Sequence, residues 1–534
     1  MIFLFKIILK FNFWKIFLAK KFYNRLQALS DSVKNPFSGG LKGIEKESLR
    51  VAGDGSLSTL SHPIELGSAL TNNYITTDFS EALLEFVTPA SKTTEEVLSN
   101  LCDIHQFTYH HLDEEFLWPA SMPCHMPPDM KIPLANYGSS NIGQAKTIYR
   151  RGLGYRYGRN MQMISGIHFN YSLPKHFWAV YQDIFNDNSN KNNFKSEQYL
   201  GLIRNFKRIG WLVLYLFGAS PAFCGSFNNS SSRPIELLKK RTHFEPYSTS
   251  LRMSDLGYSN QNQSRINISL NNLEEYISDL SDVLGKPEDS YNKIGIKVGD
   301  VYRQLNANLL QIENEFYSSI RPKRVAHSGE SPTTALRRGG IEYIEIRSLD
   351  INLFEPCGID QDTILFMEVL LIYCLLMESP GISKKEHKDI SRNHNMTASN
   401  GRDPLFKLMR NGSFVSIKEW AKEILNDIAY IAAELDQHNN GYLNAVQKMK
   451  SLVDDPDQTP SAQILACLKE KDIEFSQFAL AMAKQHRNHF SSFINKSDVE
   501  KFNYYKNEAE ASIKRQEKIE LSDNISLDKY LLKY

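Results

Sequence analysis

Closely spaced acidic residues in strand-like surroundings are the first chemically informative feature of this sequence. Glu45 and Glu47 are separated by a single residue in segment 43–51. Since successive side chains of a strand point to opposite faces, a strand here would place both carboxylates on one face, together with Leu49. Neighbouring carboxylates repel each other unless a cation lies between them, so the pair predicts either a divalent-metal site or a solvated sheet face.

A second acidic segment, 75–89, carries Asp78, Glu81 and Glu85 among apolar residues. The residues on either side of Glu85 are apolar, so this carboxylate is expected to be buried. An ionised group in such a place needs a partner or a metal, because uncompensated burial of charge is unfavourable.

Two later strand-like segments carry further polar side chains on alternate positions. His168 and Asn170 would share one face of a strand within 164–173, and Glu345 and Arg347 would share a face of another. Carboxylates and one imidazole on strands suit a hard cation such as Mg²⁺ or Mn²⁺. Each segment alone is a weak signal, whereas together they favour a metal site over a merely solvated sheet.

These segments belong to a longer series of motifs that runs in order from about Lys42 to Asp350. The matching stretches are 43–51, 76–86, 118–124, 137–143, 156–168, 217–221, 250–258, 312–317, 321–324 and 342–350. On these motifs the sequence resembles the proteobacterial type of glutamate–cysteine ligase, also called γ-glutamylcysteine synthetase. The resemblance is much looser beyond about Ile359, and none is seen before about Phe22.

The resemblance implies a specific reaction. ATP would drive the ligation of the γ-carboxylate of L-glutamate to the amine of L-cysteine through a γ-glutamyl phosphate, giving γ-glutamylcysteine in the first step of glutathione biosynthesis. Several Mg²⁺ or Mn²⁺ ions would be required, with ATP as cosubstrate. Feedback inhibition by glutathione is also compatible with the resemblance. One alternative is another carboxylate–amine ligase of the same fold that uses a different amine. A second is a non-catalytic binding protein that retains the fold, whose signature would be the loss of a metal carboxylate.

The resemblance also assigns roles to individual residues, position by position. The metal ligands would be Glu45, Glu47, Asp78, Glu85, His168 and Glu345; the catalytic groups Glu345 and Arg347; the cysteine pocket Tyr149, Arg252, Tyr258 and Tyr317; and the nucleotide-binding residues Lys323 and Arg324. Arg347 would stabilise the transferring phosphoryl group. Arg252 suits the cysteine carboxylate, since a guanidinium binds a carboxylate through two hydrogen bonds.

The expected fold is α+β. Strand-like alternation dominates the core, about 40–358, and the resemblance implies a glutamine-synthetase-like antiparallel sheet wrapped by helices. Residues of about 359–534 are predicted to be mostly helical, with helices over 361–378 and 415–435 and a solvated helix over 497–518. Segment 383–403 is polar and is expected to be a surface loop. Residues 22–534 are expected to form a single catalytic unit.

The composition fits a large cytoplasmic enzyme. The chain has 534 residues, is 42% hydrophobic and 23% charged, and carries a formal net charge of +1, which gives no reason to expect nucleic-acid binding. Its six cysteines show no CxxC spacing. This pattern predicts reduced thiols rather than a disulfide framework or a zinc site.

The first 21 residues are apolar but contain Lys6, Lys10 and Lys15. Each charge at a bilayer centre is unfavourable by about 2.5–3.5 kcal/mol, so stable membrane insertion is not expected. An interfacial helix is an alternative, although Lys15 would lie nearly opposite the other two lysines. The favoured interpretation is a dispensable N-terminal extension.

Overall fold

The computed structural model describes residues 21–123, 125–227, 235–257, 266–327, 329–437, 441–491 and 496–534. The N-terminal extension predicted over 1–21 therefore lies outside the described residues, apart from Lys21. Within the described ranges, no helix combines the length and the apolar character needed to cross a membrane.

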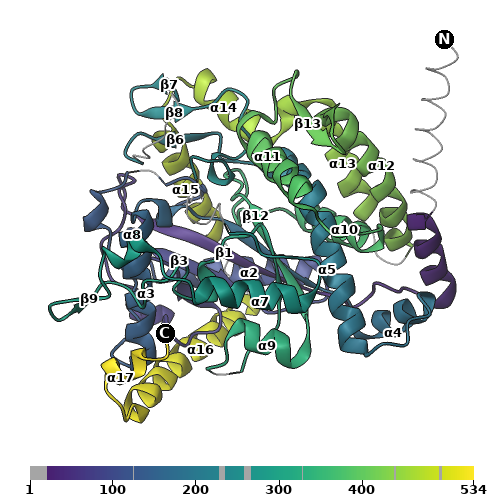
Figure 1. Cartoon of the computed structure of the whole chain (residues 1–534). Coiled ribbons are helices and arrows are strands. Elements are labelled where there is room, and N and C mark those ends of the chain that lie inside the picture. The colour runs from purple at the N-terminus through teal and green to yellow at the C-terminus, as the bar shows by residue number, and fades with distance from the viewer. Residues whose placement is uncertain are drawn as a thin grey trace, which may run out of the picture.

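A seven-stranded antiparallel sheet forms the centre of the fold (Figure 1). Its strands are β1 (Leu41–Val51), β2 (Ile75–Thr77), β3 (Leu83–Val87), β4 (Phe116–Leu117), β5 (Ile167–Ser172), β11 (Ile320–Lys323) and β12 (Tyr343–Leu349). The strand order is β11-β12-β5-β1-β3-β2, and β4 pairs with the end of β1. All four segments that the sequence predicts to carry the site contribute strands to this sheet.

The register of the sheet separates apolar from polar side chains. Ile44 on β1 is the direct partner of Phe169 on β5, which in turn pairs with Ile346 on β12. All three side chains are fully buried in the main hydrophobic core. Since the side-chain period of a strand is two, the residues next to them necessarily point to the opposite face, where the acidic side chains lie.

Helices surround the sheet, with α12 and α13 at one end of the molecule and α16 and α17 at the other (Figure 1). The helices are α2 (Thr94–His110), α3 (Asn141–Tyr157), α4 (Lys175–Ile184), α5 (Lys191–Ile209), α6 (Trp211–Phe217), α7 (Leu273–Leu284), α8 (Asp289–Asn292), α9 (Pro332–Gly339), α10 (Gln361–Leu376), α11 (Lys384–Asn400), α12 (Ile417–Asp436), α13 (Tyr442–Asp454), α14 (Pro460–Glu470), α15 (Phe475–Ser491), α16 (Lys496–Ser522) and α17 (Leu527–Leu531). Three small sheets lie outside the main one: β6 (Ala222–Cys224) with β7 (Glu236–Lys239) and β8 (Thr242–Phe244), β9 (Lys297–Val298) with β10 (Val301–Tyr302), and β13 (Lys407–Arg410) with β14 (Ser413–Ser416). The predicted α+β class and the mostly helical C-terminal part are confirmed.

Helix α10 is the centre of the helical part. Every residue from Ile364 to Leu376 is buried, as expected for a helix that is apolar on all sides. It packs against α5 and α13 and also contacts α2 and α12. Helices α10 and α12 correspond closely to the two helices that the sequence predicts over 361–378 and 415–435.

The prediction of a surface loop over 383–403 is wrong, because most of this segment forms helix α11. Ser383 caps the helix by accepting a hydrogen bond from the Glu386 N–H, an arrangement that satisfies an otherwise unpaired helical donor. Asn393 is buried and exchanges two hydrogen bonds with the backbone of Met409, at 2.7 and 2.8 Å. This polar side chain therefore binds β13 rather than solvent.

Helix α16 is only partly the solvated helix that its charged sequence suggests. Tyr505, Ala509 and Ser512 are buried against the segment that precedes β2. Gly67 permits this contact: its φ is +85°, and a Cβ atom there would lie 2.7 Å from the Cα atom of Ala509. A side chain at Gly67 would be strained and would push the helix away.

The described chain begins with a helical segment over residues 21–32 that belongs to the core. Phe22, Leu26 and Leu29 are at most 5% exposed, and the Phe22 ring meets Tyr373 of α10 edge-on at 5.2 Å between ring centres. The exposed ion pair between Lys21 and Glu378 contributes little, since such pairs are worth about 0–1 kcal/mol.

We predict that deletion of residues 1–21 leaves catalytic turnover unchanged and increases the soluble fraction. In contrast, Phe22→Ala in the full-length chain should lower the free energy of unfolding by about 3 kcal/mol, because it leaves a cavity against Tyr373. Turnover and urea unfolding of both proteins test whether the part of the chain needed for folding and activity begins at Phe22. An inactive truncated protein, together with a membrane-bound full-length protein in fractionated cells, would contradict it.

Candidate active site

Four of the predicted metal ligands converge on the polar face of the sheet from three adjacent strands. Glu47 on β1 is the direct partner of Glu85 on β3, and Glu45 is the partner of His168 on β5. His168 Nδ1 lies 3.0 Å from Glu45 Oε2, and His168 Nε2 lies 4.0 Å from Glu47 Oε1. One potential ligand atom each from Glu45, Glu85 and His168 lie within 4.8 Å of one another.

Glu345 extends this row of side chains onto β12. Its direct partner on β5 is Asn170, whose Nδ2 donates a 2.8 Å hydrogen bond to Glu45 Oε1. The Glu345 carboxylate is fully buried, with Arg347 Nη1 at 2.7 Å from one oxygen and Lys323 Nζ at 2.6 Å from the other. The positive charges of Lys323 and Arg347 therefore offset the negative charge of Glu345.

Asp78 lies at the margin of the cluster. It directly follows β2, and its side chain is 44% exposed. Arg150 on α3 approaches the Asp78 carboxylate at 3.9 Å and also donates to its backbone carbonyl, which accepts a further bond from the Tyr137 hydroxyl at 2.9 Å. The backbone at Asp78 is thus fixed, while its carboxylate stays accessible at the rim.

The electrostatics of the cluster differ from one acid to the next. Burial and the negative charges of Asp78, Glu45 and Glu47 raise the pKa of Glu85 well above its ordinary value. Burial also raises the pKa of Glu47, although His168 acts in the opposite direction. Without a cation, Glu85 is therefore the acid that most readily retains a proton.

The other two acids are held in their ionised forms. Burial would raise the pKa of Glu45, but the hydrogen bond and electrostatic attraction of His168, together with the charge of Lys323, outweigh burial and the net shift is downward. Burial opposes ionisation of Glu345 as well, yet the charges of Lys323 and Arg347 hold the pKa of this carboxyl well below its usual range.

This donor set fits a divalent cation such as Mg²⁺ or Mn²⁺. Such ions prefer carboxylate and carbonyl oxygens, and Mn²⁺ also accepts imidazole. Besides the acids and His168, the amide oxygen of Asn170 is buried and has no hydrogen-bond partner within the described residues. A cation would resolve both the repulsion around Glu85 and this unpaired acceptor.

Arg252 lies next to the cluster and is 1% exposed. Its Nη2 donates to the carbonyl of Arg347 at 2.9 Å, and its Nη1 lies 3.3 Å from the thioether sulfur of Met253. The hydroxyl of Tyr317 lies 3.0 Å from the same sulfur. Two strong donors thus converge on one weak acceptor.

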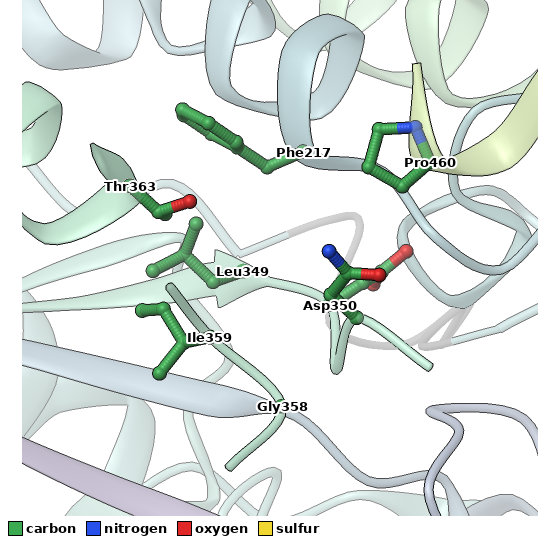
Figure 2. Close-up of a pocket in the computed structure, with 8 residues that line it drawn as sticks. Phe217, Leu349, Asp350, Gly358, Ile359, Thr363 and Pro460 are labelled. Carbon is green, nitrogen blue, oxygen red and sulfur yellow. The ribbon is translucent and has the colours of Figure 1, made fainter. Parts of the chain in front are cut away.

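Asp350 holds Arg252 in this position. Its carboxylate lies 3.5 Å from Arg252 Nη1 and accepts hydrogen bonds from the Ala219 N–H, at 2.9 Å, and from the hydroxyls of Ser220 and Ser250, at 2.6 and 2.9 Å. Figure 2 shows Asp350 at a small cavity whose wall also includes residues of α6 and of the loop after β12. A buried carboxylate with this many partners is a fixed anchor for the guanidinium.

Gly166 connects the acidic cluster with Arg252. Its N–H donates a 2.7 Å hydrogen bond to Glu47 Oε2, and a Cβ atom at this position would lie 1.9 Å from Arg252 Nη2. Any side chain here would displace Arg252. Only glycine allows the backbone to pass between the two groups.

The two remaining residues of the predicted cysteine pocket are Tyr149 and Tyr258. Tyr149, on α3, is half-buried, and burial together with the charge of Glu315 raises its pKa. The charge of Asp78 adds to this upward shift and that of Arg321 opposes it, so Tyr149 lies near both side chains at the rim of the cluster. Tyr258 lies outside the described residues.

Of the two predicted nucleotide-binding residues, the structure directs only Lys323 to the cluster. Arg324 donates to the carbonyls of Gly339 and Gly340 at the C-terminal end of α9, and it lies 3.5 Å from the exposed Glu342. Its guanidinium therefore supports a helix end, where a cation offsets the helix dipole.

The sequence model of the glutamate–cysteine ligase family matches residues 26–397. Glutamate–cysteine ligase of Alcanivorax borkumensis is 48% identical over 483 residues, which cover 89% of this chain and 92% of that protein. The chain belongs to the glutamate–cysteine ligase family. The corresponding protein of Shewanella oneidensis is 42% identical over 519 residues, covering 96% of this chain and 99% of the relative.

Solved structures agree with this family membership. The crystal structure of glutamate–cysteine ligase from Francisella tularensis in complex with AMP superposes with a TM-score of 0.87 at 36% identity, covering 93% of this chain and 97% of that one. A bifunctional glutathione synthetase from Pasteurella multocida gives a TM-score of 0.70 at 26% identity, covering 88% of this chain and 55% of that one.

Three residues contribute to the site although the sequence assigned them no role. Asn170 shares a strand face with His168, and this alternation was its only signal. Asp350 is a polar residue directly after β12, and Gly166 is a glycine directly before β5. No local pattern could have shown that Asp350 and Gly166 both contact Arg252, because those contacts join distant segments.

The raised pKa of Glu85 leads to a prediction about pH. A group whose pKa is higher in the folded state stabilises the fold below its ordinary value of 4.5, and this contribution is lost as pH rises through the folded-state pKa. The metal-free wild type should therefore lose stability relative to Glu85→Gln as pH rises between these two pKa values. The loss should be about 1.4 kcal/mol for each pH unit in that interval.

Thermal unfolding of both proteins in chelator, at a series of pH values above 4.5, measures this difference. Addition of Mg²⁺ or Mn²⁺ should stabilise the wild type at neutral pH and have a much smaller effect on Glu85→Gln. If the stabilities of the two proteins change in parallel with pH and the metals stabilise both equally, Glu85 does not bind the cation.

Proposed function

We propose that this chain ligates the γ-carboxylate of L-glutamate to the amine of L-cysteine through a γ-glutamyl phosphate formed with ATP. The observation that carries the proposal is the cluster of Glu45, Glu47, Glu85, His168 and Glu345 on one sheet face, next to Arg347. Membership of the glutamate–cysteine ligase family supports the substrates and the ATP dependence, and the AMP complex of the Francisella relative supports an adenine nucleotide.

The chemistry explains why such a cluster is needed. A carboxylate is a poor acyl donor, so it must first become an acyl phosphate, and this step brings a polyanion against another anion. Bound Mg²⁺ or Mn²⁺ would neutralise that repulsion and fix an in-line arrangement. Glu45, Glu47, Glu85, His168 and Glu345 would hold these ions, with Asp78 at the rim.

Arg347 is suited to stabilise the transferring phosphoryl group. Its Nη1 binds Glu345, whereas its Nε is buried and has no hydrogen-bond partner within the described residues. An unpaired buried donor is unfavourable by about 1–3 kcal/mol, and a phosphoryl oxygen would satisfy it. Lys323, whose ammonium lies on the other oxygen of Glu345, would bind a nucleotide phosphate once cations take over that carboxylate.

Arg252 and Tyr317 would bind the cysteine. Both present donors to the sulfur of Met253, and a thioether is a much weaker acceptor than a carboxylate. The cysteine carboxylate would take the place of this sulfur and form stronger bonds with both groups. Tyr149 and Tyr258 would complete the pocket. A ligase that used a different amine would differ in these pocket residues and not in the acidic cluster.

The partners would be L-glutamate, L-cysteine and ATP, with no nucleic acid and no stable membrane insertion. Feedback inhibition by glutathione and a cytoplasmic location also stay predictions.

We predict that Arg252→Lys raises the KM for cysteine about 30-fold and changes the KM for glutamate and ATP far less. Lysine keeps the charge but loses the planar pair of donors, a loss of about 2 kcal/mol. Steady-state kinetics with each substrate varied in turn measure this difference. Arg402→Lys is the control, because Arg402 is a half-buried arginine outside the proposed pocket that binds the carbonyls of Pro246 and Ser248. Equal changes in all three KM values would refute the pocket assignment.

We predict that ¹⁸O in the γ-carboxylate of glutamate is transferred to inorganic phosphate in step with formation of the peptide. An acyl phosphate leaves one carboxylate oxygen on the phosphate that is released. Mass spectrometry of the phosphate and of the product measures both, and the product mass also identifies the amine that was used. Unlabelled phosphate at a normal rate of ligation would rule out the γ-glutamyl phosphate.

Two glutamine variants control this experiment. Glu345→Gln should abolish nearly all labelled phosphate and peptide, because it removes a buried charge of the cation site. Glu342→Gln, three positions earlier and 42% exposed, should retain both. Near-normal turnover of Glu345→Gln would remove this residue from the reaction.

A further inference from the structure

Two cysteines that are far apart in the sequence meet on the opposite face of the sheet from the acidic cluster. Cys102 lies on α2, and Cys357 lies in the loop between β12 and α10. Their sulfur atoms are 2.7 Å apart, although 255 positions separate them in the chain. A disulfide has an S–S length of about 2.05 Å, so the sulfurs need to approach by less than about 1 Å to form one.

The two thiols differ in accessibility and in charge environment. Cys102 is partly exposed, whereas Cys357 is buried. The hydrogen bond from Cys357 lowers the pKa of the Cys102 thiol, although burial opposes the shift, and the positive charges of Lys46 and Lys501 act in the same direction as the bond. Cys102 is therefore the sulfur that meets solvent and more readily forms the nucleophilic thiolate.

The loop that carries Cys357 is packed tightly against the strand that carries the acids. A Cβ atom at Gly358 would lie 3.0 Å from the Lys46 side chain, which projects from the apolar face of β1 between Glu45 and Glu47. Figure 2 shows Gly358 at the cavity that Leu349 and Asp350 also line, and the Asp350 carboxylate lies 3.5 Å from Arg252 Nη1. The cysteine pair thus joins α2 to the loop directly behind the active site.

We propose that Cys102 and Cys357 form a reversible disulfide that locks α2 to the β12–α10 loop when the chain meets a two-electron oxidant. With hydrogen peroxide, the Cys102 thiolate attacks a peroxide oxygen and becomes a sulfenic acid while water leaves. The thiol of Cys357, losing its proton, then attacks the Cys102 sulfur and displaces a second water. Two thiols are oxidised and one peroxide is reduced to two waters.

A low-molecular-weight disulfide would give the same bridge by exchange. The Cys102 thiolate attacks one of its sulfurs and releases a small thiol, and Cys357 then displaces the second small thiol from the mixed disulfide. The small disulfide is reduced to two thiols as the two cysteines are oxidised. Both routes end in one product, which makes the position of the bridge the decisive observation.

The bridge should stabilise the folded chain. It closes a loop of 255 positions, and cross-links of long loops restrict the unfolded chain most. Since the sulfurs are already in contact and lie behind the sheet, the side chains of the acidic cluster need not move. We therefore expect the oxidised protein to unfold at a temperature higher by about 3 °C or more, with turnover within about twofold of the reduced protein.

The experiment uses the full-length chain, reduced and then treated in separate samples with hydrogen peroxide or with glutathione disulfide. Remaining thiols are alkylated, the protein is digested without reductant, and the peptides are identified by mass. Both samples should yield a cross-linked pair of peptides that contain Cys102 and Cys357, and dithiothreitol should abolish it. Cys102 recovered only as a sulfinic acid, a mixed disulfide or an alkylated thiol would overturn the proposal.

Thermal unfolding provides the second measurement. The oxidant should raise the unfolding temperature of the wild type and of Cys467→Ser, whose mutated position lies on α14 away from the pair, and should not raise that of Cys102→Ser or Cys357→Ser. If a serine variant fails to fold, the peptide map of the wild type still shows whether the bridge between Cys102 and Cys357 forms. A mapped bridge that lowers the unfolding temperature would refute its role as a lock.

Discussion

Glu47 and Glu85 face each other directly across β1 and β3, where the backbone hydrogen bonds of the sheet fix their separation. Like charges at directly opposite positions destabilise an antiparallel pair. The protein relieves this repulsion in different ways at neighbouring positions. Glu85 favours its protonated form, Glu45 binds His168, and Glu345 forms ion pairs with the side chains of Lys323 and Arg347.

The acids tolerate this arrangement because the other face of the sheet fixes the register. The row of Ile44, Phe169 and Ile346 is fully buried against the helical core. A shift of one residue in any of these strands would turn carboxylates into the core and apolar side chains into the site. The burial of the apolar row therefore supplies the free energy that holds like charges together, and the geometry of the site follows from the core behind it.

Much of this organisation could be predicted from local patterns. The alternation along segments 43–51 and 340–350 gives the correct strands and the correct faces, and the apolar run that became α10 reads plainly as a buried helix. The polar segment 383–403 was predicted wrongly, because its asparagines and serines suggest a loop whereas it forms helix α11. Its capping pair, Ser383 and Glu386, was the local signal for a helix, but the buried contact of Asn393 with β13 depends on tertiary structure.

Contacts between distant segments could not be predicted in the same way. Arg252 is held by Asp350 from the end of β12 and lies against Gly166 before β5, and neither contact leaves a periodic signal in the sequence. The family resemblance supplied a role for Arg252 but not the means by which it is fixed. Similarly, scattered cysteines without CxxC spacing gave no indication that Cys102 and Cys357 would touch.

Gly166 links the two halves of the site physically. Its N–H fixes Glu47, and its missing side chain makes room for Arg252, whose own guanidinium binds the carbonyl of Arg347. A cation that draws Glu47 closer would act on the same backbone segment that borders Arg252. The acidic cluster and the proposed amine pocket are therefore not independent sites placed side by side. They share the backbone segment just before β5, so this one segment would position both the proposed cations and the proposed amine.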